Sequence, residues 1–418
     1  MTRSMFDNDE SGRVPTAATL APRQGGALRA LRETNLRRIL EAISRDGGVS
    51  QAEVARRTDL SRATVSNLVG ELRRRGLVRI RDQQSGGRGG LEAIIGRSSN
   101  AVIGVDFGHR HVRVGIADLS GRLLADEERS LPLDLGVEES CAEAMEMATS
   151  LLAKAGLLRS DLIQAGVGLP GPIDPASGRV GWHAILHRWA GLEAPSILRE
   201  LFGLPVVVDN DGNLGALGEL RFGAGRGYTE LVYLNIATGV GAGLVIGGRV
   251  YRGAAGTAGE IGHISIDQYG QLCRCGNRGC LDTVVGVDSF LEMLRGTYGD
   301  ELTIPRVLDL ADRGDARCRR AFADAGHALG VVIADVCNLL SPQRVVVGGE
   351  LTLAGDLLFG PVRETLAQRA VPAAARAMEV VPCALGERAE MLGAIGLALD
   401  AVRAGVSTNA LAVATTAR

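Results

Sequence analysis

Three cysteines within eight residues mark the part of this sequence best equipped to bind a metal ion. Cys273, Cys275 and Cys280 are separated by short spacers that contain two glycines, which permit the sharp turns needed to bring thiolates to one point. His263 precedes them, and an imidazole with three thiolates is a common structural zinc set that leaves no open position for chemistry. The pattern predicts one structural Zn²⁺ ion per chain, and unrelated buried thiols or a redox pair are the alternatives.

A polar pair, Asn210–Asp211, follows the apolar run LPVVVD at the start of an expected helix. In open α/β sheets, ligands lie at the strand ends that face a cleft, so the pair is a candidate ligand site. A plain helix cap is the alternative.

The sequence GVDFGHRHVRVG, Gly104 to Gly115, has two short apolar runs around a tight turn, as in a β-hairpin that holds a phosphate. His109, Arg110 and His111 occupy this turn, where close approach of a phosphate usually requires glycine or a small hydroxyl residue. The hairpin therefore raises the question of whether this chain transfers phosphate at all.

Composition favours a soluble α/β protein of two to four domains. The chain has 418 residues, is 46% hydrophobic and contains 57 glycines. No apolar run reaches the ~18 residues of a membrane span, and the polar N-terminus lacks a signal-type apolar core, so we expect a cytoplasmic protein without membrane contact. Seven cysteines in such a chain do not suggest a disulfide framework. Lys154 is the only lysine and no P-loop motif is present, which excludes a P-loop NTPase.

Charge is distributed unevenly along the chain. Residues 23–88 contain 15 Arg, no Lys and 7 acidic residues, a net charge of +8, whereas residues 89–418 carry −9. A basic segment joined to an acidic body is typical of a module that binds a polyanion, most often nucleic acid. A solvated charged surface is the alternative.

The basic segment has the pattern of a winged helix-turn-helix. Ser50 and Ser61 are candidate caps of two successive helices, and the second places Val65, Leu68 and Val69 on one face. LVRIR and LEAII flank a glycine-rich turn, as in a wing. We expect the last helix in the major groove of DNA and the wing near the backbone or minor groove; a helical protein-interaction module is the alternative. The predicted DNA contacts are Arg62, Thr64, Ser66, Asn67, Arg73 and Arg88.

The remainder of the chain contains a weak internal duplication. The segments that begin at Val102 and Leu231 each resemble three strands joined by tight turns. Two such halves predict two α/β lobes with a ligand cleft between them.

The chain resembles the ROK family of sugar-responsive repressors and sugar kinases from about Arg29 to Ala404. The family's repressors carry a winged helix, and its kinases generally lack one. The resemblance implies an α/β protein with an N-terminal winged helix-turn-helix followed by a two-lobed, actin-like/ribonuclease-H-like sugar-kinase fold. It rests on SRATVSNLV (61–69), GVGLPGPID (166–174), VVVDNDGN (206–213), ATGVGAG (237–243), AGEIGH (258–263), CRCGNRGCLD (273–282) and RVVVGGEL (344–351).

The resemblance also assigns roles to the candidate ligand residues. In the family's kinases the residue matching Asn210 binds a sugar hydroxyl, and the one matching Asp211 binds the acceptor hydroxyl and takes its proton. Glu260 matches a second sugar-binding carboxylate, and His263 contacts sugar while it ligates zinc.

The sequence departs from the family pattern at three places. Asp282 stands where the family often has Glu, and Leu186 stands where it often has Asn, so the identity of the sugar is open. The kinases typically read Asp-x-Gly-Gly-Thr-Lys at the first phosphate turn, where this chain has His109, Arg110 and His111. We therefore expect no catalytic residue and no ATP, with Asp211, a vestigial base, acting as an effector ligand instead.

These observations together predict a transcriptional repressor of carbohydrate-utilisation genes that binds a palindromic DNA operator. A sugar bound in the cleft without phosphorylation would modulate it, in a homodimer or homotetramer associated with the bacterial nucleoid. The alternatives are a bifunctional sugar kinase with a DNA-binding domain and a repressor controlled by a protein partner. The predicted effector ligands are Asn210, Asp211, Glu260, His263 and Asp282. The expected domains are a disordered tail (1–22), the winged helix (23–97), a first lobe (100–222 with 388–404), a second lobe with the zinc site (223–387) and a flexible tail (405–418).

Overall fold

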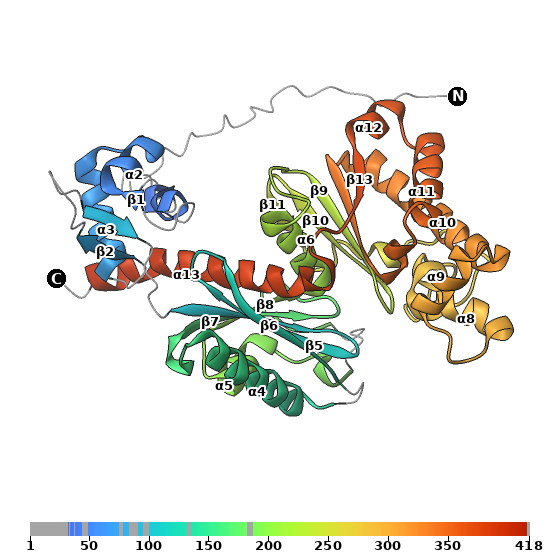
Figure 1. Cartoon of the computed structure of the whole chain (residues 1–418), viewed down its shortest axis with the longest axis horizontal. Helices are drawn as coiled ribbons and strands as arrows, with labels where there is room; N and C mark the ends of the chain where they lie inside the picture. The colour runs from blue at the N-terminus through green and yellow to red at the C-terminus, as the bar shows by residue number, and fades with distance from the viewer. Residues whose placement is uncertain are drawn as a thin grey trace, which may run out of the picture. The chain divides into compact units, whose positions relative to one another are not determined.

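Figure 1 shows the computed structural model of the chain, which consists of two units. The N-terminal unit comprises Met1–Glu71 with Ile80–Ile94, and the body comprises Leu72–Arg79 with Ile95–Arg418. The expected tail at 1–22, Arg88 of the wing and Leu186 lie outside the described residues. The structure describes residues 32, 34–36, 38–43, 49–74, 78–82, 91–94, 100–131, 135–181 and 187–415.

The N-terminal unit contains the helices expected of a winged helix-turn-helix. Helical residues between 32 and 43 precede α2 (Gln51–Thr58) and α3 (Arg62–Arg74). The hydroxyl of Ser50 accepts a backbone N–H from the first turn of α2, and that of Ser61 does the same for α3. Both serines therefore cap the helices that the sequence assigns to them.

A three-stranded sheet completes this unit, in the order β1-β3-β2. Strands β2 (Arg79–Asp82) and β3 (Leu91–Ile94) are neighbours and form the expected wing hairpin. Strand β1 (Val49–Ser50) pairs with β3 in antiparallel register and is not expected from the sequence. Two residues are too few for a recognisable alternation of apolar and polar side chains.

The body consists of two lobes, each built on a five-stranded sheet. The sheet of lobe 1 has the order β6-β5-β4-β7-β8, with antiparallel pairing in its first half and parallel pairing from β4 to β8. Helices α4 (Val137–Ala155) and α5 (Ala194–Phe202) cover one face of this sheet (Figure 1). The strands are β4 (Ala101–Phe107), β5 (His111–Asp118), β6 (Leu123–Ser130), β7 (Leu162–Leu169) and β8 (Val206–Asn210).

Lobe 2 repeats this plan. Its sheet has the order β11-β10-β9-β12-β13, again antiparallel in the first half and parallel in the second. The shared order and strand directions bear out the duplication that the sequence indicates. The strands are β9 (Leu231–Ile236), β10 (Val240–Ile246), β11 (Arg249–Tyr251), β12 (Arg344–Gly349) and β13 (Glu379–Pro382).

Helices α7 to α12 belong to lobe 2. The long helix α10 would by length and hydropathy suffice to cross a membrane, but Phe322, Leu329 and Ile333 on it are buried in the core of this lobe. It therefore serves as a core helix. The helices are α7 (Asp282–Val285), α8 (Val287–Tyr298), α9 (Ile304–Asp312), α10 (Ala316–Leu340), α11 (Asp356–Arg369) and α12 (Pro372–Ala377), with short 3-10 turns at η3 (Ile261–His263) and η4 (Glu350–Ala354). The turns η1 (Arg159–Asp161) and η2 (His187–Trp189) belong to lobe 1, and η5 (Gly386–Arg388) directly precedes the last helix.

Two helices, α6 (Asp211–Phe222) and α13 (Ala389–Thr415), pack against each other and connect the lobes. Their close approach depends on glycine. A Cβ added at Gly393 of α13 would lie 1.8 Å from the carbonyl oxygen of Leu214 in α6. The helix α13 also lies on the face of the lobe 1 sheet opposite α4 (Figure 1). The helix continues through Thr415, and the flexible tail expected from residue 405 stays a prediction.

Candidate functional site

The four predicted metal ligands gather at one point of lobe 2. Their ligand atoms all lie within 4.8 Å of one another. The Nδ1 atom of His263 is 3.5 Å from the Sγ atom of Cys273, and the Sγ atoms of Cys275 and Cys280 are 3.7 Å apart. Three thiols and one imidazole at these separations fit a tetrahedral metal site.

The loop that carries the cysteines is shaped by tight turns. Gly276 and Gly279 both have positive φ values, of 91° and 59°. A Cβ at Gly279 would also lie 1.7 Å from the carbonyl oxygen of Asp267, so only glycine fits there. Burial, together with the neighbouring thiols of Cys275 and Cys273, raises the pKa of the Cys280 thiol to about 12.

The predicted ligand pair lies where β8 ends and α6 begins, at the edge of lobe 1. Asn210 caps α6 through its Oδ1 atom, which accepts the N–H of Asn213 at 3.2 Å. Its Nδ2 group donates to the carbonyl oxygen of Gly171 at 3.0 Å and to Oδ1 of Asp211 at 2.8 Å. Both interpretations of this pair are therefore compatible with the structure, because Asn210 caps the helix while Asp211 keeps one oxygen for a ligand.

Asp211 has a carboxyl group that binds a proton unusually well. Burial, together with the neighbouring charge of Asp106, raises its pKa to about 7. Glu260 adds a smaller repulsion, and its own pKa is raised by burial. Near neutral pH the Asp211 carboxyl can therefore both donate and accept a hydrogen bond, as recognition of a sugar hydroxyl requires.

His263 lies between the metal cluster and the predicted ligand site. Its Nδ1 atom faces Cys273, and its Nε2 atom is 3.8 Å from Oε2 of Glu260. One imidazole ring thus touches a cysteine of the cluster on one side and a predicted sugar ligand on the other. This geometry is compatible with the dual role that the sequence suggests for His263.

Asp282 has contacts that sequence analysis does not anticipate. Its Oδ1 atom accepts the backbone N–H of Val240 at 2.6 Å, and its Oδ2 atom is 3.3 Å from Arg274. A Cβ at Gly239 would lie 2.7 Å from the same Oδ1 atom. Asp282 therefore braces the glycine turn at residues 238–241, and its place in the sugar shell stays a prediction.

The turn between β4 and β5 reaches across to lobe 2. The Nδ1 atom of His109 is 3.1 Å from the hydroxyl of Thr238, which belongs to the corresponding turn of lobe 2. Arg110 forms an ion pair of 3.3 Å with Asp288 at the start of α8. His111 turns back within its own lobe, and its Nε2 atom is 3.2 Å from Oδ2 of Asp106. Side chains of the turn between β4 and β5 thus lie between this turn and the turn from β9 to β10.

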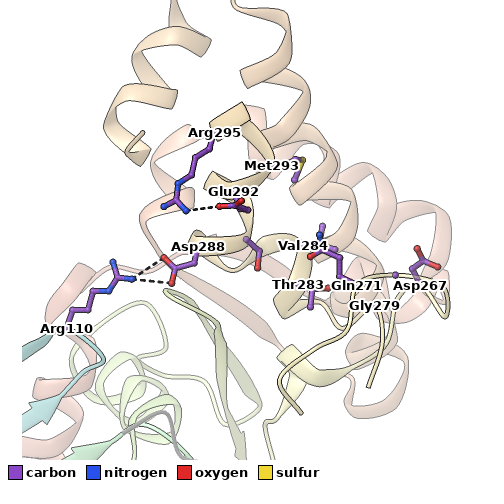
Figure 2. Close-up of a pocket in the computed structure, with 12 residues that line it drawn as sticks. Arg110, Asp267, Gln271, Gly279, Thr283, Val284, Asp288, Glu292, Met293 and Arg295 are labelled. Atoms are coloured by element: carbon purple, nitrogen blue, oxygen red, sulfur yellow. Dashed lines mark hydrogen bonds and ion pairs between the residues drawn. The ribbon is translucent and has the colours of Figure 1, made fainter. Parts of the chain in front are cut away.

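Figure 2 shows a pocket beside this ion pair, between the cysteine loop and α8. Arg110 and Asp288 lie at one end of the pocket, and Asp267 and Gln271 lie at the other. Its lining does not include Asn210, Asp211 or Glu260, so it is separate from the predicted sugar site.

A group of buried polar residues below the first turn is missed by sequence analysis. Asp106 is 3% exposed, and its Oδ1 atom has no hydrogen-bond partner among the described residues. Glu390 of α13 accepts hydrogen bonds from Tyr233 and Asn235, and burial raises its pKa to about 8. Burial opposes the charged form of His111, but the hydrogen bond to Asp106 and the negative charges of Asp106, Glu128 and Glu390 together outweigh this and raise the pKa. No sequence signal brings Glu390 here, since it lies far along the chain.

Most residues predicted to contact DNA lie on α3, and their role stays a prediction. Val65, Leu68 and Val69 are buried, as the helical spacing predicts. The hydroxyl of Thr64 is 2.8 Å from that of Ser61, so this side chain takes part in the cap. The predicted contacts that are exposed are Arg62, Ser66, Asn67 and Arg73.

Comparison with known proteins gives two family matches. The ROK family model matches residues 102–401, and the MarR family model matches residues 37–89. Among relatives, a xylose repressor of Caldicellulosiruptor bescii is 29% identical over 385 residues, covering 88% of this chain and 96% of its own length. An N-acetylglucosamine repressor of Escherichia coli O157:H7 is 30% identical over 402 residues, covering 92% and 96% respectively.

Solved structures show the same similarity. A ROK family transcriptional regulator, a homologue of the E. coli MLC protein, matches with a TM-score of 0.78 and 25% identity over 91% of this chain and 99% of its own. A ROK family glucokinase from Streptomyces griseus, in complex with glucose and AMPPNP, matches with a TM-score of 0.64 and 28% identity over 72% of this chain and 100% of its own. The regulator thus matches a larger share of this chain than the body alone contains, and the kinase matches a smaller share.

Proposed function

The chain belongs to the ROK family and carries a MarR-type winged helix, and we propose from this that it is a sugar-responsive transcriptional repressor. It binds a palindromic duplex operator as a homodimer or homotetramer in the bacterial cytoplasm, at the nucleoid, and controls genes of carbohydrate use. A sugar or sugar derivative bound by Asn210, Asp211, Glu260, His263 and Asp282 changes its DNA affinity. The sugar acts because it binds one conformer better than the other.

The contact between His109 and Thr238 is the main support for our proposal that the protein does not phosphorylate the sugar. Phosphoryl transfer depends on positioning a triphosphate between backbone N–H groups and small side chains. Here an imidazole joins the two turns, and Arg110 pairs with Asp288 beside it. The body therefore binds a sugar without a nucleotide, and Asp211 acts as a ligand.

The metal in the cluster is a structural zinc ion, one per chain. The Cys₃His donor set is typical of closed zinc sites, and the four ligand atoms lie within 4.8 Å of one another. The ion holds the cysteine loop in place and fixes His263 at the edge of the sugar site. Elemental analysis of protein purified without chelator tests this: one zinc per chain is expected, and its absence would contradict the assignment.

Operator binding is tested with the full chain in a selection from random duplexes. We expect a palindromic consensus, because two symmetric winged helices read two half-sites. Arg62→Ala should weaken binding by about 1–3 kcal/mol if the guanidinium contacts a base. Arg306→Ala removes an exposed arginine of the body and serves as the control. A selection that enriches no sequence would contradict DNA recognition.

The effector is tested by thermal shift of the full chain with D-xylose, N-acetyl-D-glucosamine and D-glucose. The first two are chosen from the names of relatives that are xylose and N-acetylglucosamine repressors, and the third from the glucokinase complex. Stabilisation that is lost in Asp211→Ala supports the sugar site. Stabilisation by none of them favours a repressor controlled by a protein partner, and sugar-dependent ATP hydrolysis favours a bifunctional kinase.

A further inference from the structure

The two halves of the proposed sugar site come from different lobes. Asn210 ends β8 and Asp211 begins α6 in lobe 1, and Glu260 and His263 lie in the segment after β11 of lobe 2. A sugar can contact both pairs only when the lobes stand at one particular separation. Some element must therefore set this separation, and Arg252 lies where it contacts both halves.

The side chain of Arg252 contacts the lobe 1 half of the proposed sugar site through Asp209. Its Nε atom donates to Oδ2 of Asp209 at 2.9 Å, and its Nη2 atom donates to the same oxygen. Asp209 is 2% exposed, so this ion pair holds a buried carboxylate next to the ligand pair. Its other oxygen accepts the backbone N–H of Asn210 at 2.9 Å and the Nδ2 group of Asn213 at 3.0 Å. The Asp209 carboxylate thus links Arg252 to Asn210, because it is hydrogen-bonded to both residues.

The backbone of Arg252 contacts the lobe 2 half of the proposed sugar site through Ala258. Its carbonyl oxygen accepts the N–H of Ala258 at 3.2 Å, two residues before Glu260. The loop between these residues also fits closely against lobe 1. A Cβ at Gly256, which has a φ of 73°, would lie 1.9 Å from the carbonyl oxygen of Ile173.

We propose that Arg252 is a positioning residue for the effector, which holds the Asn210–Asp211 and Glu260–His263 halves at the separation a sugar requires. This rests on the proposed sugar site. Arg252 acts through Asp209 and the backbone of Ala258, not by contact with the ligand. Loss of its guanidinium leaves each half folded on its own lobe and removes the ion pair that joins the halves. Packing such as that at Gly256 then holds them less precisely, so that a sugar must order the site as it binds.

The first measurement needs no ligand. Hydrogen–deuterium exchange of the full, zinc-loaded chain is compared between the wild type and Arg252→Gln. We expect exchange to become about tenfold faster or more in residues 206–222 and 252–266, the two segments that Arg252 joins. Residues 162–169 of the lobe 1 core should exchange at an unchanged rate. Arg249→Gln, which changes an exposed arginine on the same hairpin, is the control and should leave all three segments unchanged.

The second measurement uses the sugar among D-xylose, N-acetyl-D-glucosamine and D-glucose that stabilises the wild type. Arg252→Gln should raise its Kd about tenfold, and Arg252→Lys, which keeps the charge but not the two-pronged contact, should raise it less. Asp209→Asn combined with Arg252→Gln should bind about as weakly as Arg252→Gln alone, since both changes remove one link.

The outcomes separate this inference from the proposed function. If no sugar binds the wild type, the proposed effector is wrong, and exchange alone decides: faster exchange in both segments supports the link, and unchanged exchange in either segment overturns it. If a sugar binds wild type and Arg252→Gln equally well, the positioning role is overturned. Faster exchange throughout the body, including residues 162–169, would show a general structural role and would also overturn it.

Discussion

The two hairpin turns of the body occupy equivalent places in sheets of the same order, yet their side chains differ. The turn from β9 to β10 keeps Thr238 and Gly239, and Asp282 packs against it closely enough to exclude a Cβ at Gly239. The turn from β4 to β5 carries His109 and Arg110, which cross to lobe 2. The strand order alone therefore does not require small residues in these turns. Which residues fit in each turn depends on the side chains that pack against it.

The lobes also differ in the segments outside the hairpins. Lobe 2 continues into the Cys₃His loop, and the described residues of lobe 1 contain no comparable cluster. Lobe 1 instead contributes the carboxyl groups of Asp106 and Asp211 to the buried side of the site. One half of the site is thus held by a metal-binding loop, and the other half by backbone caps and a buried carboxylate network.

The largest effect is expected from removing one of the proposed metal ligands, a cluster that among the described residues occurs in lobe 2 alone. Cys280→Ala should abolish zinc binding and lower the free energy of unfolding by several kcal/mol, since structural zinc contributes ~10–16 kcal/mol to the folding of small zinc-binding peptides. Cys337→Ala is a matched control, because both thiols are fully buried. Thermal unfolding and elemental analysis measure the effect. Equal losses in the two variants would mean that the cluster is an ordinary group of core thiols.

Replacing Asp211 of lobe 1 is expected to change the free energy of unfolding by a smaller amount and in the opposite direction. Because the folded-state pKa of about 7 exceeds the ordinary value of 3.8, the stability that this group contributes falls as the pH rises from about 4 to 7. Asp211→Asn removes that loss, so the variant should be more stable than the wild type at pH 7 by at most about 4 kcal/mol. The two proteins should differ little at pH 4.

Asp315→Asn gives the contrasting control for this pH dependence. Hydrogen bonds from the backbone of Cys318 and from Tyr298 lower the pKa of Asp315, so its contribution is present at neutral pH and is lost as the pH falls through that pKa. Denaturant unfolding between about pH 2 and 8 measures both variants, since the Asp315 contribution changes only below about pH 4. A wild type and an Asp211→Asn variant with parallel pH profiles would show that Asp211 is not the group that titrates near 7.

The sequence predicts these features unequally well, for physical reasons. Helix caps at Ser50 and Ser61 and the buried face of α3 depend on residues three or four apart, so local pattern suffices. The cysteine cluster is likewise nearly local, with three of its four ligands in one loop. The repeated sheet order is also visible, because each lobe begins with the same succession of strands and turns.

Contacts between the lobes are not predictable in this way. His109 and Thr238 are 129 residues apart, and Arg252 and Asp209 belong to different lobes. Such pairs depend on how the lobes pack around α6 and α13. Glu390 enters the site from the last helix for the same reason. The residue types alone predict that the turn between β4 and β5 is too bulky for a phosphate. Only the structure shows which residues the side chains of His109 and Arg110 contact.

Rebuilding the first turn in the kinase pattern tests the comparison of the two turns directly. His109→Gly, Arg110→Thr and His111→Lys together give the turn Gly-Gly-Thr-Lys. This variant should gain affinity for AMPPNP, from no measurable binding to a Kd of about 1 mM, which is a binding free energy of about −4 kcal/mol. Isothermal titration of wild type and variant measures the change. Binding by the wild type with equal affinity, or sugar-dependent ATP turnover by it at ~1–100 s⁻¹ as in kinases, would show that the bulky turn does not exclude nucleotide.

The smallest effect is expected from breaking the contact between the turns one side chain at a time. His109 is hydrogen-bonded to Thr238 in a partly buried place, so His109→Ala should lower the free energy of unfolding by about 0.5–1.5 kcal/mol. The pair between Arg110 and Asp288 is exposed on both sides, so Arg110→Ala should cost less, about 0–1 kcal/mol, and its effect should fade as salt is added. Denaturant unfolding at low and high salt separates the two. If Arg110→Ala costs more than His109→Ala, the ion pair rather than the imidazole is what connects the turns, and the argument that the first turn blocks nucleotide through His109 must be transferred to Arg110.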